Sequence, residues 1–160
     1  MEAVFKSIYL KFFAPLCRFA NFYCSDVEEA KNIVQSVFLK IWEGDKLILN
    51  QSEAAVKSYL FASVKNSALN ANRKKAVFTE LEAADLNISN AHEVDHAVQD
   101  LEDKIKILVQ NLPERCRYVF YLSRNEEMSY KEIADLLDIS TKTVENQISK
   151  ALKYLRSKVF

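Results

Sequence analysis

The stretch Ser129–Lys158, SYKEIADLLDISTKTVENQISKALKYLRSK, decides the fold of the part of the chain that contains it. Ser129 followed three residues later by Glu132 is typical of a capping box, in which two side chains close the first turn of a helix. We predict a corner at Asp138, because Asp tolerates left-handed backbone better than most residues. A second helix then opens at Thr141. The pattern therefore predicts a helix-turn-helix unit.

The second helix of this unit has two different faces. Its apolar residues form one stripe, the kind of stripe that a helix buries against its own domain; they are Val144, Ile148, Ala151, Leu152 and Leu155. Lysine and amide side chains occupy the other side, and we expect Thr143 and Gln147 at its margin. Such a face suits the major groove of DNA, where amides and hydroxyls read base edges and ammonium groups bind phosphates. The alternative, for this helix alone, is an ordinary lysine-rich solvent face.

The composition favours a soluble all-α protein. Of 160 residues, 49% are apolar and 28% are charged, while Gly occurs once and Pro twice, too few for the turns of a large sheet. No segment approaches the roughly 18 apolar residues that a membrane helix needs, so we expect no membrane insertion. The three cysteines, Cys17, Cys24 and Cys116, fit neither a disulfide framework nor a zinc site. We expect them to be reduced core residues of a cytoplasmic protein.

Opposite charges are segregated along this chain of zero net charge. Residues 1–77 contain 11 basic and 7 acidic residues, as do residues 104–160, so each block carries +4. Residues 78–103 contain 8 acidic residues and no basic one, which gives −8. This acidic stretch is polar and weakly periodic, so we predict two helical domains, 1–77 and 100–160, joined by an acidic flexible linker over 78–99. In the free protein the linker either stays solvated or covers the basic blocks.

The N-terminal block, residues 1–77, is predicted to form three helices. The first has an aromatic face and should kink or restart near Pro15. The second follows Asp26, has acidic residues in its first turn, and carries a broad apolar stripe that includes Trp42. Ser52 can cap the third, which begins neutral, ends basic and places Phe61 in the core.

Three segments of this chain resemble a bacterial RNA polymerase sigma factor of the extracytoplasmic-function type, a branch of the sigma-70 family, in the variety expanded in Bacteroides. DVEEAKNIVQSVFLKIW (26–42) is similar to the polymerase-binding segment of region 2, and SYLFASVKNSALNANRKK (58–75) to the helix that melts and reads the minus-10 element. LPERCRYVFYLSRNEEMSYKEIADLLDISTKTVENQISKALKYLR (112–156) is similar to region 4. The order and spacing of the three segments make the resemblance specific.

The resemblance implies three sets of functional residues. The positions that would bind core RNA polymerase are Asn32, Gln35, Ser36 and Phe38, where the loss of the family's common acidic residues shifts the contact toward apolar packing. Those that would meet the minus-10 element are Lys57, Tyr59, Lys65, Asn66, Asn70, Arg73 and Lys74. Those that would face the minus-35 element are Lys142, Thr143, Asn146, Gln147 and Lys150. Gln at 147, where the family often has Arg, predicts a shifted minus-35 sequence, since Gln prefers adenine and Arg guanine.

The implied function is a sigma factor with no catalytic site and no cofactor. Its partners would be core RNA polymerase, promoter DNA and an anti-sigma protein, which in this family is commonly membrane-bound. The rival interpretation is a stand-alone helix-turn-helix regulator that binds an operator without polymerase. The motif HEVDH, His92–His96, matches a zinc-protease signature, but it lies in the acidic linker without an obvious third ligand, so incidental metal binding is favoured over proteolysis.

Overall fold

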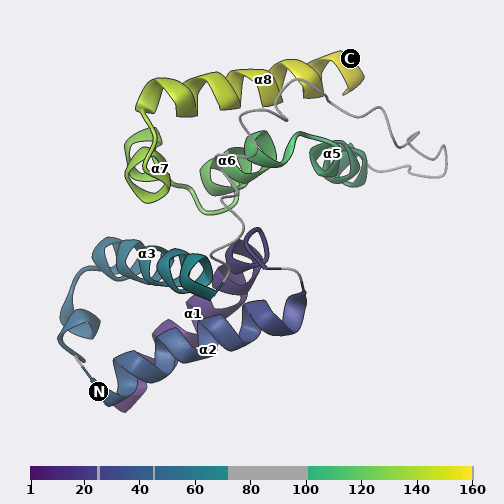
Figure 1. Cartoon of the computed structure of the whole chain (residues 1–160). Coiled ribbons are helices and arrows are strands. Elements are labelled where there is room, and N and C mark those ends of the chain that lie inside the picture. The colour runs from purple at the N-terminus through teal and green to yellow at the C-terminus, as the bar shows by residue number, and fades with distance from the viewer. Residues whose placement is uncertain (25, 45, 72–100, 160) are drawn as a thin grey trace. The chain divides into compact units, whose positions relative to one another are not determined.

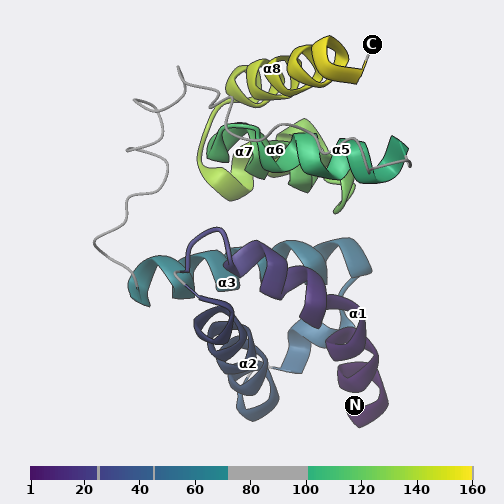
Figure 2. The same cartoon turned by 90° about the vertical axis from the view of Figure 1, so that its right-hand side faces the viewer.

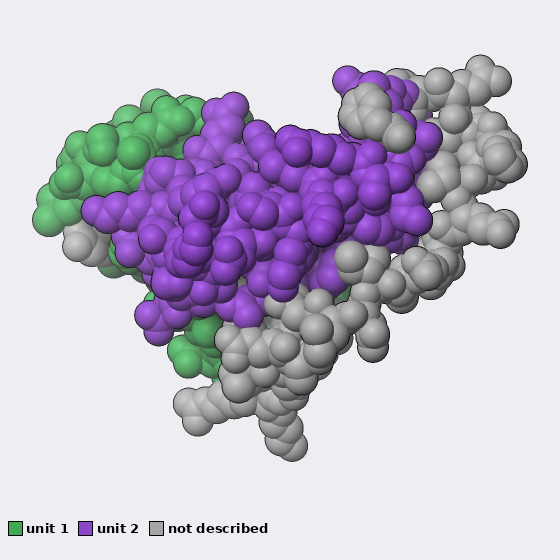
Figure 3. Space-filling model, turned by 90° about the horizontal axis from the view of Figure 1, so that it is seen from above, with its two compact units in different colours: residues 1–77 green, residues 78–160 purple. Residues whose placement is uncertain are grey.

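The computed structural model describes residues 1–24, 26–44, 46–71 and 101–159 (Figure 1). These residues form α-helices and one 3₁₀-helix, and there is no strand among them, which confirms the all-α prediction. The chain divides into two compact units, residues 1–77 and residues 78–160 (Figure 3). Each unit has its own core and is considered by itself below.

Unit 1 is a bundle of three α-helices. They are α1 (Glu2–Ala20), α2 (Val27–Glu43) and α3 (Glu53–Ala71), and the short 3₁₀-helix η1 (Lys46–Asn50) connects the last two. Each α-helix contacts the other two (Figure 2). Their shared core contains Phe19 of α1, whose ring centroid lies 4.9 Å from that of Phe61 of α3. Phe61 is fully buried, as the sequence predicted.

Two of the helix starts in unit 1 are capped by side chains, and the cap at Ser52 was predicted from the sequence. Asp26 Oδ1 accepts a hydrogen bond from the backbone N–H of Glu29 at 2.7 Å, and Ser52 Oγ accepts one from that of Ala55 at 3.2 Å. These bonds satisfy donors that the first turn of a helix otherwise leaves unpaired. An ion pair between Lys11 and Glu53 also links α1 to the first turn of α3.

Pro15 lies inside α1, which continues from Glu2 to Ala20. Of the two outcomes predicted at this position, a kink or a restart of the helix, the restart is therefore wrong. A proline removes one backbone donor within a helix. In α1 the buried side chains on both sides of Pro15, Phe12, Leu16 and Phe19, hold the helix against its neighbours and offset that loss.

Unit 2 contains α5 (Leu101–Gln110), α6 (Glu114–Arg124), α7 (Tyr130–Leu137) and α8 (Thr141–Val159). The long helix α8 packs against all three of the others (Figures 1 and 2). Pro113 is the N-cap of α6 and separates this helix from α5. The apolar stripe of α8 faces inward, with Val144, Ile148 and Ala151 buried.

The corner between α7 and α8 has the geometry that its sequence predicts. Both capping-box bonds are present: Ser129 Oγ accepts from the N–H of Glu132 at 3.1 Å, and Glu132 Oε1 accepts from the N–H of Ser129 at 3.3 Å. Asp138 ends α7 with φ 56° and ψ 48°, which is the left-handed region. Helix α7, this corner and α8 form the predicted helix-turn-helix.

The prediction that all three cysteines are core residues is correct for Cys116 alone. Cys116 is buried, whereas Cys17 and Cys24 are only half-buried. Burial raises the pKa of the Cys17 thiol above its ordinary value, an effect larger than the lowering by nearby Lys31 and Arg18. The Cys17 thiol is therefore protonated at neutral pH. None of the helices that the structure describes is long and apolar enough to span a membrane.

Several sequence predictions lie outside the described residues. They are the acidic flexible linker over 78–99, the HEVDH motif of His92–His96, and the two basic positions Arg73 and Lys74.

Candidate functional site

The outer face of α8 presents a stripe of polar side chains. Lys142, Asn146 and Lys150 are exposed, and their spacing of four residues aligns them along one side of the helix. Thr143, at the margin of this stripe, is half-buried. Ser140 caps the helix, because its Oγ accepts from the backbone N–H of Thr143 at 3.0 Å and shares a hydrogen bond with Thr143 Oγ1 at 2.9 Å. This cap was not predicted, although Ser before Thr-Lys-Thr is a recognisable N-cap signal.

Positive charge continues along the exposed side of α8. Lys142 Nζ lies 3.5 Å from Glu145 Oε2, but both side chains are largely exposed, and such surface pairs contribute about 1 kcal/mol or less. Lys142 can therefore exchange Glu145 for a phosphate at little cost. Farther along the helix, Lys153, Arg156 and Lys158 are also exposed. The outer side of α8 has the mixture of amide and cationic groups that binding to a DNA groove requires.

Gln147 does not lie on this outer face, and its predicted place at the exposed margin is wrong. Its side chain is 3% exposed, and its Oε1 accepts a hydrogen bond from Cys116 Sγ of α6 at 2.8 Å. The side chain is amphipathic and turns inward because the thiol offers a partner inside the unit. Four of the five predicted minus-35 residues thus remain on or beside the outer face: Lys142, Thr143, Asn146 and Lys150.

The exposed face of α3 brings together three of the predicted minus-10 residues. Tyr59 is 45% exposed, and Asn66 and Asn70 are exposed on the same side, two and about three helical turns farther on. Lys65 is half-buried at the flank of this face. Lys57 is nine residues from Asn66, which places it about half a turn around the helix, on the opposite side. The structure therefore does not group Lys57 with the others.

Helix α2 presents a stripe that includes three of the four predicted polymerase-binding residues. Asn32, Gln35 and Ser36 are exposed, and Leu39 extends the stripe with a side chain that is 54% exposed. Phe38 differs, because it is 2% exposed and packs between α1 and α2. Its ring centroid lies 4.9 Å from that of Tyr9. Phe38 is thus a core residue and not part of the exposed stripe.

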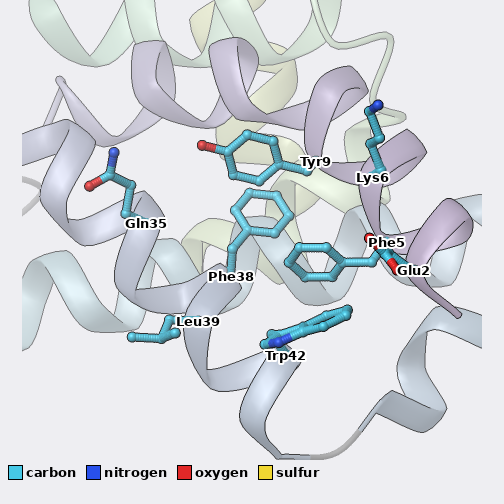
Figure 4. Close-up of a pocket in the computed structure, with 8 residues that line it drawn as sticks. All are labelled: Glu2, Phe5, Lys6, Tyr9, Gln35, Phe38, Leu39 and Trp42. Atoms are coloured by element: carbon cyan, nitrogen blue, oxygen red, sulfur yellow. The ribbon is translucent and has the colours of Figure 1, made fainter.

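An apolar groove of about 510 Å³ lies between α1 and α2, beside the exposed stripe (Figure 4). Four of its eight lining residues are aromatic, and polar side chains lie at its two ends: Gln35 at one, Glu2 and Lys6 at the other. The lining residues are Glu2, Phe5, Lys6 and Tyr9 from α1 and Gln35, Phe38, Leu39 and Trp42 from α2. Phe38, the buried member of the predicted set, lines this groove from the inside.

Trp42 lines this groove and also reaches the surface. It is 37% exposed, although the sequence analysis placed it in the apolar stripe of its helix. Its ring lies 4.9 Å from that of Phe5, and Lys46 Nζ lies 4.2 Å from its centroid, within the range of a cation–π interaction. Four aromatic residues at helical spacing, Phe5 and Tyr9 on one helix and Phe38 and Trp42 on the next, were the available signal.

In the part of the chain that the structure covers, no group of three or more His, Cys, Asp or Glu side chains is placed to hold a metal ion. Two faces carry groups suited to nucleic acid, one on α3 and one on α8, and the third is apolar.

Comparisons with known proteins agree with the geometry. Residues 103–155 match the family described as Sigma-70, region 4. The chain is similar to the RNA polymerase sigma-H factor of Pseudomonas aeruginosa, with 27% identity over 144 residues, an alignment that covers 81% of this chain and 72% of that protein. The fold is similar to that of the sigma factor RpoE in its co-crystal structure with the anti-sigma factor NepR from Bartonella quintana, with a TM-score of 0.60, 22% identity and coverage of 96% of this chain and 94% of that chain.

Proposed function

We propose that the chain is a sigma-70 factor of the extracytoplasmic-function type, which binds core RNA polymerase and directs it to promoters with distinct minus-10 and minus-35 elements. The observation that carries the proposal is the outward stripe of Lys142, Asn146 and Lys150 on α8, within the residues that match region 4. Unit 1 then supplies the polymerase contact and the minus-10 contact. Unit 2 supplies the minus-35 contact.

On the minus-35 side, α8 would lie in the major groove. Asn146 presents an amide that can form two hydrogen bonds with an adenine edge, and Thr143 presents a hydroxyl that Ser140 orients. Lys142 and Lys150 would contact phosphates on the strands beside the groove. The sequence-based preference for adenine therefore moves from Gln147 to Asn146.

On the minus-10 side, the exposed face of α3 would hold single-stranded DNA. Tyr59 offers a ring on which a base can stack, while Asn66 and Asn70 offer amides to base edges. Unstacking a base costs a few kcal/mol, and such contacts offset that cost. Lys65 at the flank suits the strand backbone, and Arg73 and Lys74 stay sequence-based predictions for the same role.

The polymerase contact would combine the polar stripe of α2 with the apolar groove. Asn32, Gln35 and Ser36 are uncharged, so attraction between charges contributes little, and Leu39 and Trp42 supply exposed apolar area beside them. An amphipathic helix of the polymerase would fit this surface if one of its apolar side chains enters the groove and its polar side chains contact Gln35. Phe38 contributes from below, because it sets the depth of the groove.

The proposed role is one of binding and not of catalysis, and it is exercised in the cytoplasm, where polymerase and promoters are. The solved relative that shares this fold is bound to an anti-sigma factor, and we propose that this chain is likewise held inactive by an anti-sigma protein. Assignment to the Bacteroides variety of the family stays a prediction.

The alternative, a stand-alone regulator, is tested by measuring whether the chain needs polymerase in order to bind duplex DNA. We expect the full chain to bind core enzyme tightly, and to protect a promoter from nuclease only in its presence. Lys150→Glu should abolish promoter protection while leaving core binding unchanged. Lys106→Glu makes the same charge change on α5 and serves as the matched control. Equal protection of one DNA site with and without core enzyme would establish the regulator instead.

A further inference from the structure

The recognition helix α8 carries a buried polar side chain that apolar packing does not account for. Gln147 is 3% exposed, and Cys116, its partner on α6, is 1% exposed. Cys116 Sγ donates to Gln147 Oε1 at 2.8 Å, which joins two helices whose bonded residues are 31 positions apart in the chain. A buried polar group is costly unless it is hydrogen-bonded, so the bond determines where this side chain can lie.

The pair is embedded in the apolar contact between α6 and α8. Cys116 forms a buried cluster with Leu112 and Ala151, and Phe120 and Tyr154 pack against it. Ala151 is one turn beyond Gln147 on α8, so the hydrogen bond borders the apolar cluster directly. Apolar contacts are not directional and tolerate small rotations of one helix on another, whereas a hydrogen bond has a preferred distance and angle.

We propose that Gln147 is a positioning residue, whose hydrogen bond to Cys116 fixes the rotation of α8 about its own axis. On the helix, Gln147 lies between the inward residues Val144 and Ala151 and the outward residues Thr143 and Lys150. Rotating α8 until Gln147 faced DNA would turn Asn146 away and expose Val144 to water. The present outer face and a base contact from Gln147 therefore exclude each other.

This inference rests on the proposed function, which states that the outer face of α8 contacts DNA. A fixed rotation of α8 matters when that face must meet base edges. Removal of the thiol takes away the bond that Gln147 accepts and lets α8 sample other rotations. The loss should weaken every minus-35 contact together. A base-reading residue behaves differently, because its removal relaxes discrimination at its own base pair.

The test compares Cys116→Ala with Cys116→Ser in the full chain. The two substitutions leave side chains of nearly equal size, but the serine hydroxyl can still donate to Gln147 Oε1. Gln147→Met removes the acceptor with little change of volume, and Ile148→Val is the control for a small packing loss on the same side of α8. Each variant is assembled with core polymerase and assayed on a promoter pool that contains every single substitution in the minus-35 element.

We expect Cys116→Ala to lower promoter use roughly fivefold at all minus-35 sequences alike, as the loss of one buried hydrogen bond implies. Cys116→Ser and Ile148→Val should stay near wild type. Gln147→Met should match Cys116→Ala, and the double variant should lose no more than either. If Gln147→Met changes preference at one base pair while Cys116→Ala changes nothing, Gln147 reads a base and the proposal is wrong.

A second measurement needs neither polymerase nor promoter. Amide hydrogen exchange of α8 in the full chain should be faster in Cys116→Ala than in Cys116→Ser, with the difference confined to the turns around Gln147. Equal exchange in the two variants would overturn the proposal even if promoters are used normally. Failure of the wild-type holoenzyme on all promoters would instead contradict the proposed function, and the exchange result would still decide the role of the pair.

Discussion

Asp138 holds a backbone conformation that few side chains adopt, with φ 56° and ψ 48° at the corner of the helix-turn-helix. Glycine adopts this conformation without steric cost, while its flexibility in the unfolded chain offsets part of the gain. We therefore expect Asp138→Gly to change the free energy of unfolding by about 1 kcal/mol or less, in the stabilising direction. Asp138→Val should destabilise unit 2 by about 1–3 kcal/mol, because a β-branched residue is strained there.

Thermal unfolding of the two variants checks this prediction. A large fall in the unfolding midpoint of Asp138→Gly, or a Val variant as stable as wild type, would contradict a left-handed corner at this position.

Asn66 stands at the centre of the exposed face of α3, between Tyr59 and Asn70. If it contacts an unpaired base, Asn66→Ala should lower transcription about 5- to 150-fold, which corresponds to the 1–3 kcal/mol of a specific base contact. Affinity for core polymerase and thermal stability should not fall, since the residue is exposed and Ala favours helix. Asn21→Ala, the same change at an exposed position that follows α1, is the control. Equal transcription by both variants would remove Asn66 from the minus-10 site.

At the scale of the helices, the sequence was most informative where the cause is local. The capping box of Ser129 and Glu132 and the corner at Asp138 depend on residues within a few positions of one another, and all were predicted. Ser140, the cap of α8, was missed although its signal is equally local. The all-α class followed from the scarcity of turn residues and from apolar spacing.

Predictions failed where tertiary contacts override a residue's usual environment. Gln147 is polar but buried, and the thiol of Cys116 on another helix donates a hydrogen bond to it. Trp42 is apolar but partly exposed, since α1 leaves a groove beside it. The helix around Pro15 continues because its neighbours hold it. A single sequence does not say which helix lies opposite these residues, so neither the groove nor the Cys116–Gln147 pair could be predicted.

The groove between α1 and α2 leads to a prediction about the exposed side of α2. Leu39→Asp places a carboxylate at the edge of the groove and should weaken core-polymerase binding roughly tenfold or more, because a buried leucine contributes about 1.5–3 kcal/mol. Leu47→Asp alters an exposed leucine of η1 outside the groove and should leave core affinity unchanged. Fluorine-labelled Trp42, the chain's single tryptophan, should change its NMR signal on binding. Equal core affinities for the two Asp variants would exclude the groove from the contact.

At the scale of the whole molecule, the proposed function joins two binding units in one chain. Once one unit is held on polymerase, the other meets DNA at a high effective concentration, so neither needs strong binding alone. This explains how a chain with zero net charge can bind DNA. Each basic block needs only local positive charge, and polymerase supplies further contacts to the phosphates.

The acidic sequence between the two basic blocks predicts a salt-dependent restraint on the free protein. Replacing Glu80, Glu82, Asp85, Glu93 and Asp95 with their amides should raise its affinity for DNA at low salt, if these carboxylates compete with phosphates for the lysines. The gain should fade as the Debye length falls from about 10 Å at 0.1 M salt to about 3 Å at 1 M. Five substitutions among uncharged residues of the same stretch are the control. An unchanged affinity at low salt would show that the acidic stretch does not mask DNA binding.

The most direct test of the central claim is run-off transcription from a promoter library, with core RNA polymerase alone and with the full chain added. We predict that core enzyme alone starts at random, and that addition of the chain selects a set of promoters sharing one minus-10 and one minus-35 sequence. Lys150→Glu and Asn66→Ala should each lose that selection, at the minus-35 and minus-10 elements respectively. If the chain binds the same DNA without polymerase and initiates at no promoter with it, the account is wrong.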